Sequence, residues 1–319
     1  MIDGDMTLEQ LRNYKGITPC PEDFDIYWNQ QLKQIKNYVA PFEMTYLPHL
    51  SSKVMECYDL TFISFDGSKL YAKYLKPASS DKKPLVFQFH GYPGASRSFL
   101  ELSGFVAADM AIVSMDCRGQ GGKSHDHSNY PGSTVNGHLI MGLSSDSPDD
   151  FYYRKVFLDT AVLVKLMKTF EATDHTKLYA NGASQGAALA LICASLNPEI
   201  KKVAALYPFL SDYQRVWEMN LDLVAYEGLR YFNKWFDPAG VRIQETFTKL
   251  GYIDVKNFVS RIKGSVMMGT GLLDDICPPS TQFAVYSHLT CIKEHHLYPN
   301  YSHELIRDFD DRIVNFLRS

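Results

Sequence analysis

The segment Gly182-Ala183-Ser184-Gln185-Gly186 stands between the apolar run Leu178–Ala180 and the alanine- and leucine-rich run Ala187–Leu191. An apolar run, a tight turn and a run of helix formers predict a strand, a turn and a helix in that order. Glycines two positions before and after the serine let strand and helix cross closely, because a Cβ at either place would collide. Such a nucleophile elbow would project the Ser184 hydroxyl into a cleft.

The same turn supplies a second chemical group. It places the backbone N–H of Gln185 at the start of a helix, where the N–H can hold the oxyanion that forms when a serine attacks an ester or amide carbonyl. A short pattern of this kind also occurs in ordinary strand-to-helix turns. The rest of the chain therefore has to distinguish a catalytic turn from a structural one.

Length and composition fit one elaborated domain. The chain has 319 residues, of which 45% are hydrophobic, so it can bury a large core. Its net charge is −4, and its lysines and arginines are scattered, so we expect no nucleic-acid partner. No apolar run approaches the ~20 residues that cross a bilayer, and the first residues lack a secretory pattern. These features predict a soluble, cytoplasmic protein with no membrane partner.

The six cysteines are widely spaced and include no C-x-x-C pair. In a chain of this length that spacing favours reduced, buried thiols over a disulfide framework or a zinc site. His125-Asp126-His127 is an H-x-H pattern, but no third ligand stands at a suitable spacing, so we predict no metal. Gly119-Gln120-Gly121-Gly122 lacks the spacing of a dinucleotide loop, and we expect no cofactor.

Short apolar runs alternate with segments of helical period, which is typical of parallel strands covered by crossover helices. The fold class is therefore α/β, with a mostly parallel central sheet and helices on both faces. The predicted strands are Leu85–Phe89, Ala111–Met115, Leu178–Ala180, Val203–Tyr207, Ser265–Met268 and Glu294–Tyr298. The predicted amphipathic helices are Phe24–Ile35, Tyr152–Phe170 and Leu305–Phe316.

The remaining segments complete a single domain over residues 1–319. Two alternating runs, Tyr58–Ile63 and Leu70–Tyr74, flank the turn signal Asp66-Gly67 and predict an antiparallel hairpin that leads into the sheet. Residues 211–252 fit no strand pattern, and we interpret them as a small helical insertion near the cleft. Residues 1–50 form an N-terminal extension.

A catalytic elbow requires partners at predictable places, and the first is an oxyanion loop. His90-Gly91-Tyr92-Pro93-Gly94 follows the predicted strand Leu85–Phe89 and matches the H-G-x type of loop. The Tyr92 backbone N–H would then act together with that of Gln185. A plain turn rich in glycine and proline is the alternative interpretation.

A carboxylate and a histidine also follow later strands. Asp274 or Asp275, after Ser265–Met268, would orient a histidine, and His303-Glu304 opens the C-terminal helix after the last predicted strand. Serine is a poor nucleophile near neutral pH, so the imidazole has to take its proton while the carboxylate fixes the imidazole tautomer. The order of serine, acid and histidine is that of the α/β-hydrolase fold.

The residues resemble one family, the acetyl xylan esterases and cephalosporin C deacetylases of carbohydrate esterase family 7. The likeness covers nearly the whole chain, and the R-G-Q, G-x-S-Q-G and H-E motifs together are more specific than any one of them. The stretches that carry it are Asp116–Gly122, Asp149–Arg154, Gly182–Gly186, Gly271–Asp274 with Ile276–Thr281, and His303-Glu304.

This resemblance implies roles for particular residues. It implies Ser184 as nucleophile, His303 as base and Asp274, rather than Asp275, as the orienting acid. It also implies that the backbone N–H groups of Tyr92 and Gln185 form the oxyanion hole.

The resemblance further implies a substrate and an assembly. Family members act on the acetyl groups of xylose oligosaccharides and cephalosporin C, and they form hexamers, so we expect a small acetylated substrate and a homo-oligomer. Arg118 and Gln120 belong to the family signature, but we interpret them as structural, because a guanidinium at a strand end can tie down the elbow region. From its position alone, Ile276 is a candidate wall of a pocket for short acyl chains.

Two other functions remain open. A longer-chain esterase or a peptidase on the same fold would differ in cleft shape rather than in its triad. A non-catalytic binding module of this fold would ordinarily lack one of the reacting residues.

Overall fold

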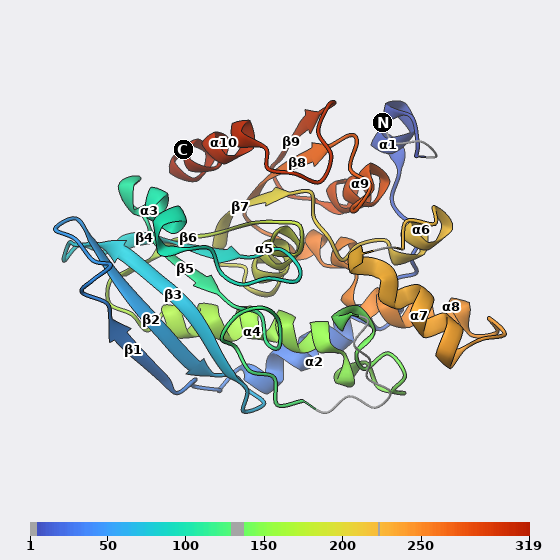
Figure 1. The fold of residues 1–319 in the computed structure, drawn as a ribbon, viewed down its shortest axis with the longest axis horizontal. Coiled ribbons are helices and arrows are strands. Elements are labelled where there is room, and N and C mark those ends of the chain that lie inside the picture. Colours follow the sequence, from blue (N-terminus) through green and yellow to red (C-terminus); the bar gives the residue numbers. More distant parts are fainter. Residues whose placement is uncertain (1–4, 129–136, 223) are drawn as a thin grey trace.

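A mixed β-sheet forms the centre of the computed structural model, which describes residues 5–128, 137–222 and 224–319 (Figure 1). Its strands in this part of the chain are β1 (Phe42–Tyr46), β2 (Met55–Ile63), β3 (Lys69–Pro77), β4 (Lys83–Phe89), β5 (Ala111–Met115), β6 (Thr173–Ala183), β7 (Ile200–Leu206), β8 (Ser265–Gly271) and β9 (Lys293–Tyr298). They pair in the order β1-β2-β3-β5-β4-β6-β7-β8-β9. The pairs from β1 through β3 to β5 are antiparallel, and those from β5 to β9 are parallel.

Most predicted strands are confirmed, with two differences. The hairpin of Tyr58–Ile63 and Leu70–Tyr74 is β2 with β3, as predicted. Tyr207 lies outside β7, because its φ of 37° ends the extended conformation. Strand β1 was missed, since all five of its residues are exposed and it pairs with β2 alone at the sheet edge.

Helices lie on both faces of this sheet (Figure 1). They are α1 (Leu8–Asn13), α2 (Phe24–Ile35), α3 (Phe99–Ala107), α4 (Tyr152–Met167), α5 (Gln185–Leu196), α6 (Tyr213–Glu218), α7 (Glu227–Phe236), α8 (Ile243–Leu250), α9 (Pro279–His288) and α10 (Arg307–Arg318). Short 3₁₀ turns are η1 (His138–Ile140), η2 (Pro148–Asp150), η3 (Val224–Tyr226), η4 (Gly251–Ile253), η5 (Val255–Asn257) and η6 (Val259–Arg261). No helix in the described ranges is long and apolar enough to cross a membrane.

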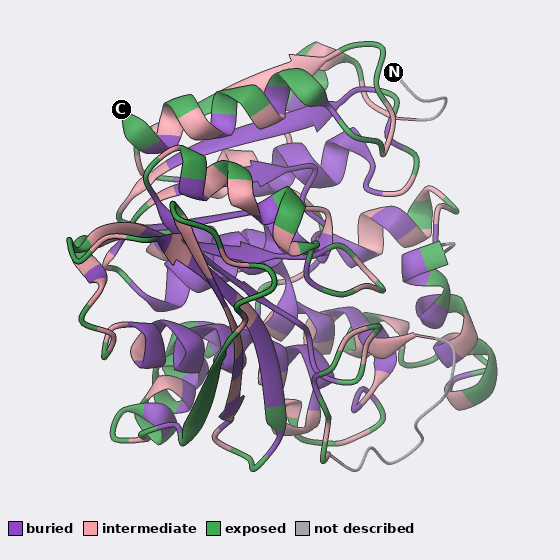
Figure 2. Ribbon diagram, turned by 60° about the vertical axis from the view of Figure 1, so that its left-hand side comes forward, coloured by how far each residue is buried: buried purple, intermediate pink, exposed green. Residues whose placement is uncertain are grey.

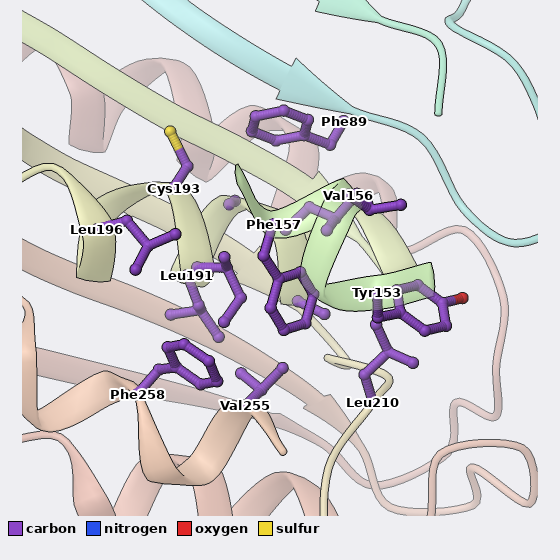
Figure 3. Packing of buried hydrophobic residues seen from close by; sticks show 14 of the residues in the cluster. Phe89, Tyr153, Val156, Phe157, Leu191, Cys193, Leu196, Leu210, Val255 and Phe258 are labelled. Atoms are coloured by element: carbon purple, nitrogen blue, oxygen red, sulfur yellow. The ribbon is translucent and has the colours of Figure 1, made fainter. Parts of the chain in front are cut away.

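The central parallel strands β4, β5, β7 and β8 are largely buried, as Figure 2 shows for the centre of the molecule, whereas β9 at the edge is not. Along β4, Leu85 and Phe87 belong to the core cluster that α2, α4 and α5 cover, whereas Val86 belongs to a second cluster under α3 and α10. Successive side chains of a strand point to opposite faces, which explains this alternation. In Figure 3, Leu191 and Leu196 of α5 lie among Phe157 and other side chains of the larger cluster.

Three expectations about helices need correction. Helix α4 ends at Met167 and is buried almost all round, not amphipathic, because it lies beneath α2 as well as against α5. Helix α10 begins at Arg307, so His303 lies in the loop before it and does not open it. The buried stripe of α10 is Phe309, Ile313 and Leu317, and Leu305 is exposed.

Segment 211–252 contains α6, η3, α7, α8 and most of η4, and it has no strand among the residues described. Residue 223 lies outside the description. Tyr226, the residue before α7, places its ring 4.6 Å from that of Phe209, just after β7. Helix α7 of this segment therefore begins beside the carboxyl end of β7.

A buried ion-pair network joins the segment after β5 to helix α4 and to the turn between β2 and β3. The guanidinium of Arg118 is fully buried and donates from Nε and Nη2 to the carboxylate of Asp159 on α4, at 2.7 and 2.6 Å. It also donates to Asp66 in the β2–β3 turn. Burial raises the pKa of Asp159, and the Arg118 charge opposes that rise. The interpretation of Arg118 as a structural residue agrees with these contacts.

We expect Asp159→Asn to lower the free energy of unfolding by about 3 kcal/mol, because it leaves a buried guanidinium with one carboxylate fewer. Urea denaturation at pH 7 measures the change. Asp25→Asn is the matched control, since Asp25 pairs with Arg261 on the surface at 2.6 Å with its side chain 78% exposed. That variant should differ by less than about 0.5 kcal/mol. Equal losses in the two variants would contradict the role of the buried network.

Candidate active site

Ser184 occupies a strained turn between β6 and α5. Its φ of 57° and ψ of −122° lie outside the ordinary regions for a residue with a side chain. An added Cβ at Gly182 would lie 2.3 Å from the carbonyl carbon of Gly186, and one at Gly186 would lie 2.1 Å from the carbonyl oxygen of Phe89. Both glycines are therefore required by backbone atoms that cannot move aside. The elbow geometry has the form that the sequence predicts.

Asp274 is completely buried and contacts His303. The Nδ1 atom of His303 lies 2.9 Å from Oδ2 of Asp274. The other carboxylate oxygen accepts the backbone N–H groups of Ile276 and Cys277 at 3.0 and 2.8 Å. These bonds replace the water that the carboxylate loses on burial and fix its orientation.

Asp275 is exposed, in contrast to Asp274. Asp274, rather than Asp275, therefore contacts His303, as the family resemblance implies. An ionised carboxylate only accepts hydrogen bonds, so the His303 ring donates from Nδ1 and leaves Nε2 free to act as a base.

Two sets of contacts place Ser184 close to Asp274 and His303. The Ser184 side chain lies beside the Cys277 thiol, and the backbone N–H of Cys277 donates to Asp274. The Ser184 N–H donates to the carbonyl of Leu206 at 3.0 Å, and the ring of the next residue, Tyr207, lies 4.4 Å from that of His303. Serine, acid and histidine thus meet at the carboxyl ends of β6, β7 and β8, where open α/β sheets bind ligands.

The predicted oxyanion loop passes over the elbow. An added Cβ at Gly91 would lie 3.9 Å from the Cβ of Ser184. The Tyr92–Pro93 peptide bond is cis, and within the described chain the Tyr92 N–H has no protein acceptor. The Gln185 N–H belongs to the first residue of α5, one of the positions that helices leave without an internal acceptor. Both predicted donors are therefore available to a ligand.

The side chain of His90 links this loop to the segment after β5. Its Nδ1 lies 2.8 Å from the Gly91 carbonyl, and its Nε2 lies 2.9 Å from the Cys117 backbone nitrogen. Because the backbone N–H has to donate, Nε2 accepts and Nδ1 carries the proton. Burial lowers the pKa of His90, which keeps the ring in this neutral form.

The side chain of Gln185 is held by a buried polar cluster. Its Oε1 accepts from the Tyr153 hydroxyl and from Nε2 of Gln120, each at 2.9 Å. Its Nε2 donates back to Oε1 of Gln120 at 3.1 Å. Gln120 also donates to the Tyr152 hydroxyl, which in turn donates to the Arg118 carbonyl at 2.6 Å. Gln120 thus holds the side chain of Gln185, the predicted source of one oxyanion donor.

The Tyr92 side chain is held by His138 of η1. The Tyr92 hydroxyl lies 3.2 Å from Nδ1 of His138 and accepts the His138 backbone N–H at 3.3 Å. Nε2 of His138 lies 3.1 Å from the Gly119 carbonyl. The ring therefore donates from Nε2 and accepts the Tyr92 proton at Nδ1.

Sequence reasoning missed His138, Tyr153 and the contact of Gln120 with Gln185. The R-G-Q motif pointed to Gln120 but not to its partner. No local pattern marks His138, which lies 46 residues from Tyr92 along the chain.

Ile276 lies just beyond the acid. Its side chain is half-buried and packs against the main core cluster, and its N–H binds Asp274. No group of three histidine, cysteine or acidic residues in the described ranges could hold a metal ion.

Comparison with known proteins places this geometry in a family. The model of the acetyl xylan esterase family AXE1 matches residues 1–319. Acetyl esterase Axe7A of Xylanibacter ruminicola is 26% identical over 305 residues, which are 91% of this chain and 65% of that protein. The chain thus spans about two thirds of the length of this relative.

Two solved structures are similar over nearly their whole length. Acetyl xylan esterase 1 from Thermoanaerobacterium sp. JW/SL YS485 has a TM-score of 0.95 and 44% identity, with 98% of each chain covered. Acetyl xylan esterase from Paenibacillus sp. R4 has a TM-score of 0.93 and 29% identity, with 98% of this chain and 99% of that one covered. The chain therefore belongs to the acetyl xylan esterase family of carboxylic ester hydrolases and has the α/β-hydrolase fold.

Proposed function

We propose that this protein is a serine esterase that removes acetyl groups from acetylated xylo-oligosaccharides, and from small acetyl esters such as cephalosporin C. The observation that carries the proposal is the 2.9 Å contact of His303 with the buried Asp274, beside a strained Ser184, in a chain of the acetyl xylan esterase family. The similar proteins named above are themselves an acetyl esterase and acetyl xylan esterases.

In this proposal Ser184 attacks the acetyl carbonyl while Nε2 of His303 takes the hydroxyl proton. The resulting imidazolium is stabilised by Asp274, whose other oxygen is already saturated by two backbone N–H groups. The imidazolium then gives the proton to the departing sugar oxygen, so the sugar leaves as an alcohol and an acetyl-enzyme remains. Water, deprotonated by His303, attacks this ester, the imidazolium returns the proton to the Ser184 oxygen, and acetate is released.

The tetrahedral intermediates carry a negative charge on the former carbonyl oxygen. We assign the N–H groups of Tyr92 and Gln185 to that oxygen. Fixed donors of this kind stabilise the transition state because they need no reorientation as charge develops. The cluster of Gln120, Tyr153 and Gln185 and the bonds of His90 keep both peptide groups in place.

The alternative function is hydrolysis of longer acyl esters or of peptides by the same groups. We favour acetyl esters, and we assign Ile276 to the wall that limits the acyl chain. Its half-buried side chain is held by the bond of its own N–H to Asp274, so the wall has a fixed position relative to the acid.

Hydrolysis of p-nitrophenyl acetate, butyrate, hexanoate and octanoate tests this proposal. We expect fast turnover of acetate that falls with chain length, and a loss on the order of 10⁶ in kcat for Ser184→Ala with the fold retained. Ile276→Ala should raise the rate for hexanoate relative to acetate. A preference for octanoate would favour the longer-chain esterase, and Ser184→Ala activity within about tenfold of the parent would exclude Ser184 as nucleophile.

The two neighbouring acids provide a matched pair of variants. Asp274→Asn should lower kcat by about 10⁴, because an amide favours the wrong His303 tautomer and does not stabilise the imidazolium. Asp275→Asn should stay within about twofold, since the Asp275 side chain is exposed. Both are measured with p-nitrophenyl acetate at saturation, and comparable losses in the two would contradict the assignment of the acid.

A further inference from the structure

A cavity of about 230 Å³ opens between α3 and α10, on the sheet face opposite α4 and α5. The two helices lie near each other in the teal and red parts of Figure 1. The backbone of Gly182 and Ala183, immediately before Ser184, forms part of its lining. Ser184, Asp274, His303, Tyr92 and Gln185 are all absent from that lining. The cavity is therefore distinct from the proposed catalytic groups.

One buried polar side chain of the cavity has an atom without a protein partner. Asn181 is 6% exposed, and its Oδ1 is buried without a hydrogen bond in the described part of the chain. Tyr207 also lines the cavity, but its hydroxyl is not among the buried unpartnered atoms of the described residues. Buried amides are usually satisfied, so the Asn181 amide indicates a polar occupant.

Charged side chains from the α3 side and from α10 both line the cavity. Arg97, before α3, is exposed, and Asp310 of α10 is half-buried. Neither side chain has an ion-pair partner within 4 Å among the residues described. Glu101 also lines the cavity, but its carboxylate already caps α3 by accepting from Ser98. The mouth therefore offers one guanidinium and one carboxylate, which attract each other without forming a close ion pair.

Gln88 also lines the cavity, but its amide already bonds to Ser114 and to the Phe89 carbonyl. The rest of the wall is apolar and limits the size of an occupant. It consists of Leu102, Phe105, Leu206, Leu305, Phe309 and Ile313, with Val314 beside them. At about 30 Å³ of liquid per water molecule, the space would hold about seven or eight waters. That is room for one small organic molecule and too little for an oligosaccharide.

We propose that this cavity binds a neutral polyol of monosaccharide size, for which D-xylose is the probe. Each hydroxyl of such a molecule both donates and accepts, so it can satisfy the carboxylate of Asp310, the guanidinium of Arg97 and the amide of Asn181 together. Its C–H groups fit the apolar wall. An anion would face the carboxylates of Glu101 and Asp310 with one guanidinium to offset them. The site itself does not depend on the esterase proposal, and only the choice of xylose rests on it.

The cavity adjoins the catalytic histidine through one residue. Tyr207 has a φ of 37°, a strained value for a residue with a side chain, and its ring lies 4.4 Å from the His303 ring. A polyol bonded to the Tyr207 hydroxyl would therefore stand one side chain away from His303.

Gly104 of α3 lines the cavity and gives a way to fill it. An added Cβ at Gly104 meets no atom within 4 Å, and both alanine and leucine favour a helix more than glycine does. Gly104→Leu should therefore fold and occupy the space, whereas Gly104→Ala adds a single methyl group. Arg97→Met is a second variant, at an exposed position, that removes one polar contact and leaves the cavity open.

Isothermal titration with D-xylose tests the site on the full chain. The parent should bind with a dissociation constant on the order of 1 mM, Gly104→Ala should stay within about threefold, and Gly104→Leu and Arg97→Met should bind about tenfold more weakly or not at all. Hydrolysis of p-nitrophenyl acetate should stay within about twofold in all three variants, since none of these residues contacts the proposed catalytic groups.

Several outcomes would overturn the inference. Equal binding of xylose by the parent, Gly104→Leu and Arg97→Met would place the sugar elsewhere, for example in the catalytic cleft. Absence of heat up to about 100 mM xylose would exclude the polyol, as would binding of L-serine in its place. A parent protein without esterase activity that still binds xylose in a Gly104-dependent way would refute the proposed function and support the cavity site.

Discussion

The close approach of the β6–α5 turn to the end of β4 is the constraint on which the site depends. The backbone of Gly186 passes so near the Phe89 carbonyl that a Cβ there would lie 2.1 Å from its oxygen. Because the loop from His90 to Gly94 leaves β4 at the same point, this contact sets the position of that loop relative to Ser184. The two proposed oxyanion donors come from segments more than 90 residues apart, and Nε2 of Gln185 also joins these segments by donating to the His90 carbonyl at 3.4 Å.

Asp274 depends on hydrogen bonds that offset the loss of water around its carboxylate. Asp274 is fully buried, so its charge is sustained by the two backbone N–H groups on one oxygen and by His303 and Gln282 on the other. Asp275 has water around it and needs no such set. Adjacent acids in the sequence thus differ in their surroundings because the chain turns one into the protein and the other out of it.

Local pattern predicted the parts of the structure that local physics decides. The strands β4 and β5, the hairpin of β2 with β3 and the turn at Ser184 follow from apolar runs and glycine spacing. Strand β1 alternates apolar and polar residues over Phe42–Tyr46, a signal that the prediction did not use, and all five residues are exposed. The start of α10 was misplaced because His303 is held in a loop by Asp274, a partner 29 residues away. The contacts of Gln120 with Gln185 and of His138 with Tyr92 likewise join residues far apart in the chain. No local sequence pattern predicts them.

The packing on the two faces of the sheet differs, and each face supports a different part of the site. On the α4 side, Arg118 joins Asp159 and Asp66, and its carbonyl binds Tyr152, which contacts Gln120 and through it the oxyanion residue Gln185. That chain of buried bonds leaves little freedom, since moving one member would unsatisfy the others. On the α3 and α10 side, Tyr207 backs His303 with one face of its ring and borders an open cavity. The proposed oxyanion donors are therefore fixed by a filled polar core, whereas His303 rests on the less completely packed layer, where changes in packing can reach the proposed base without disturbing the proposed oxyanion hole.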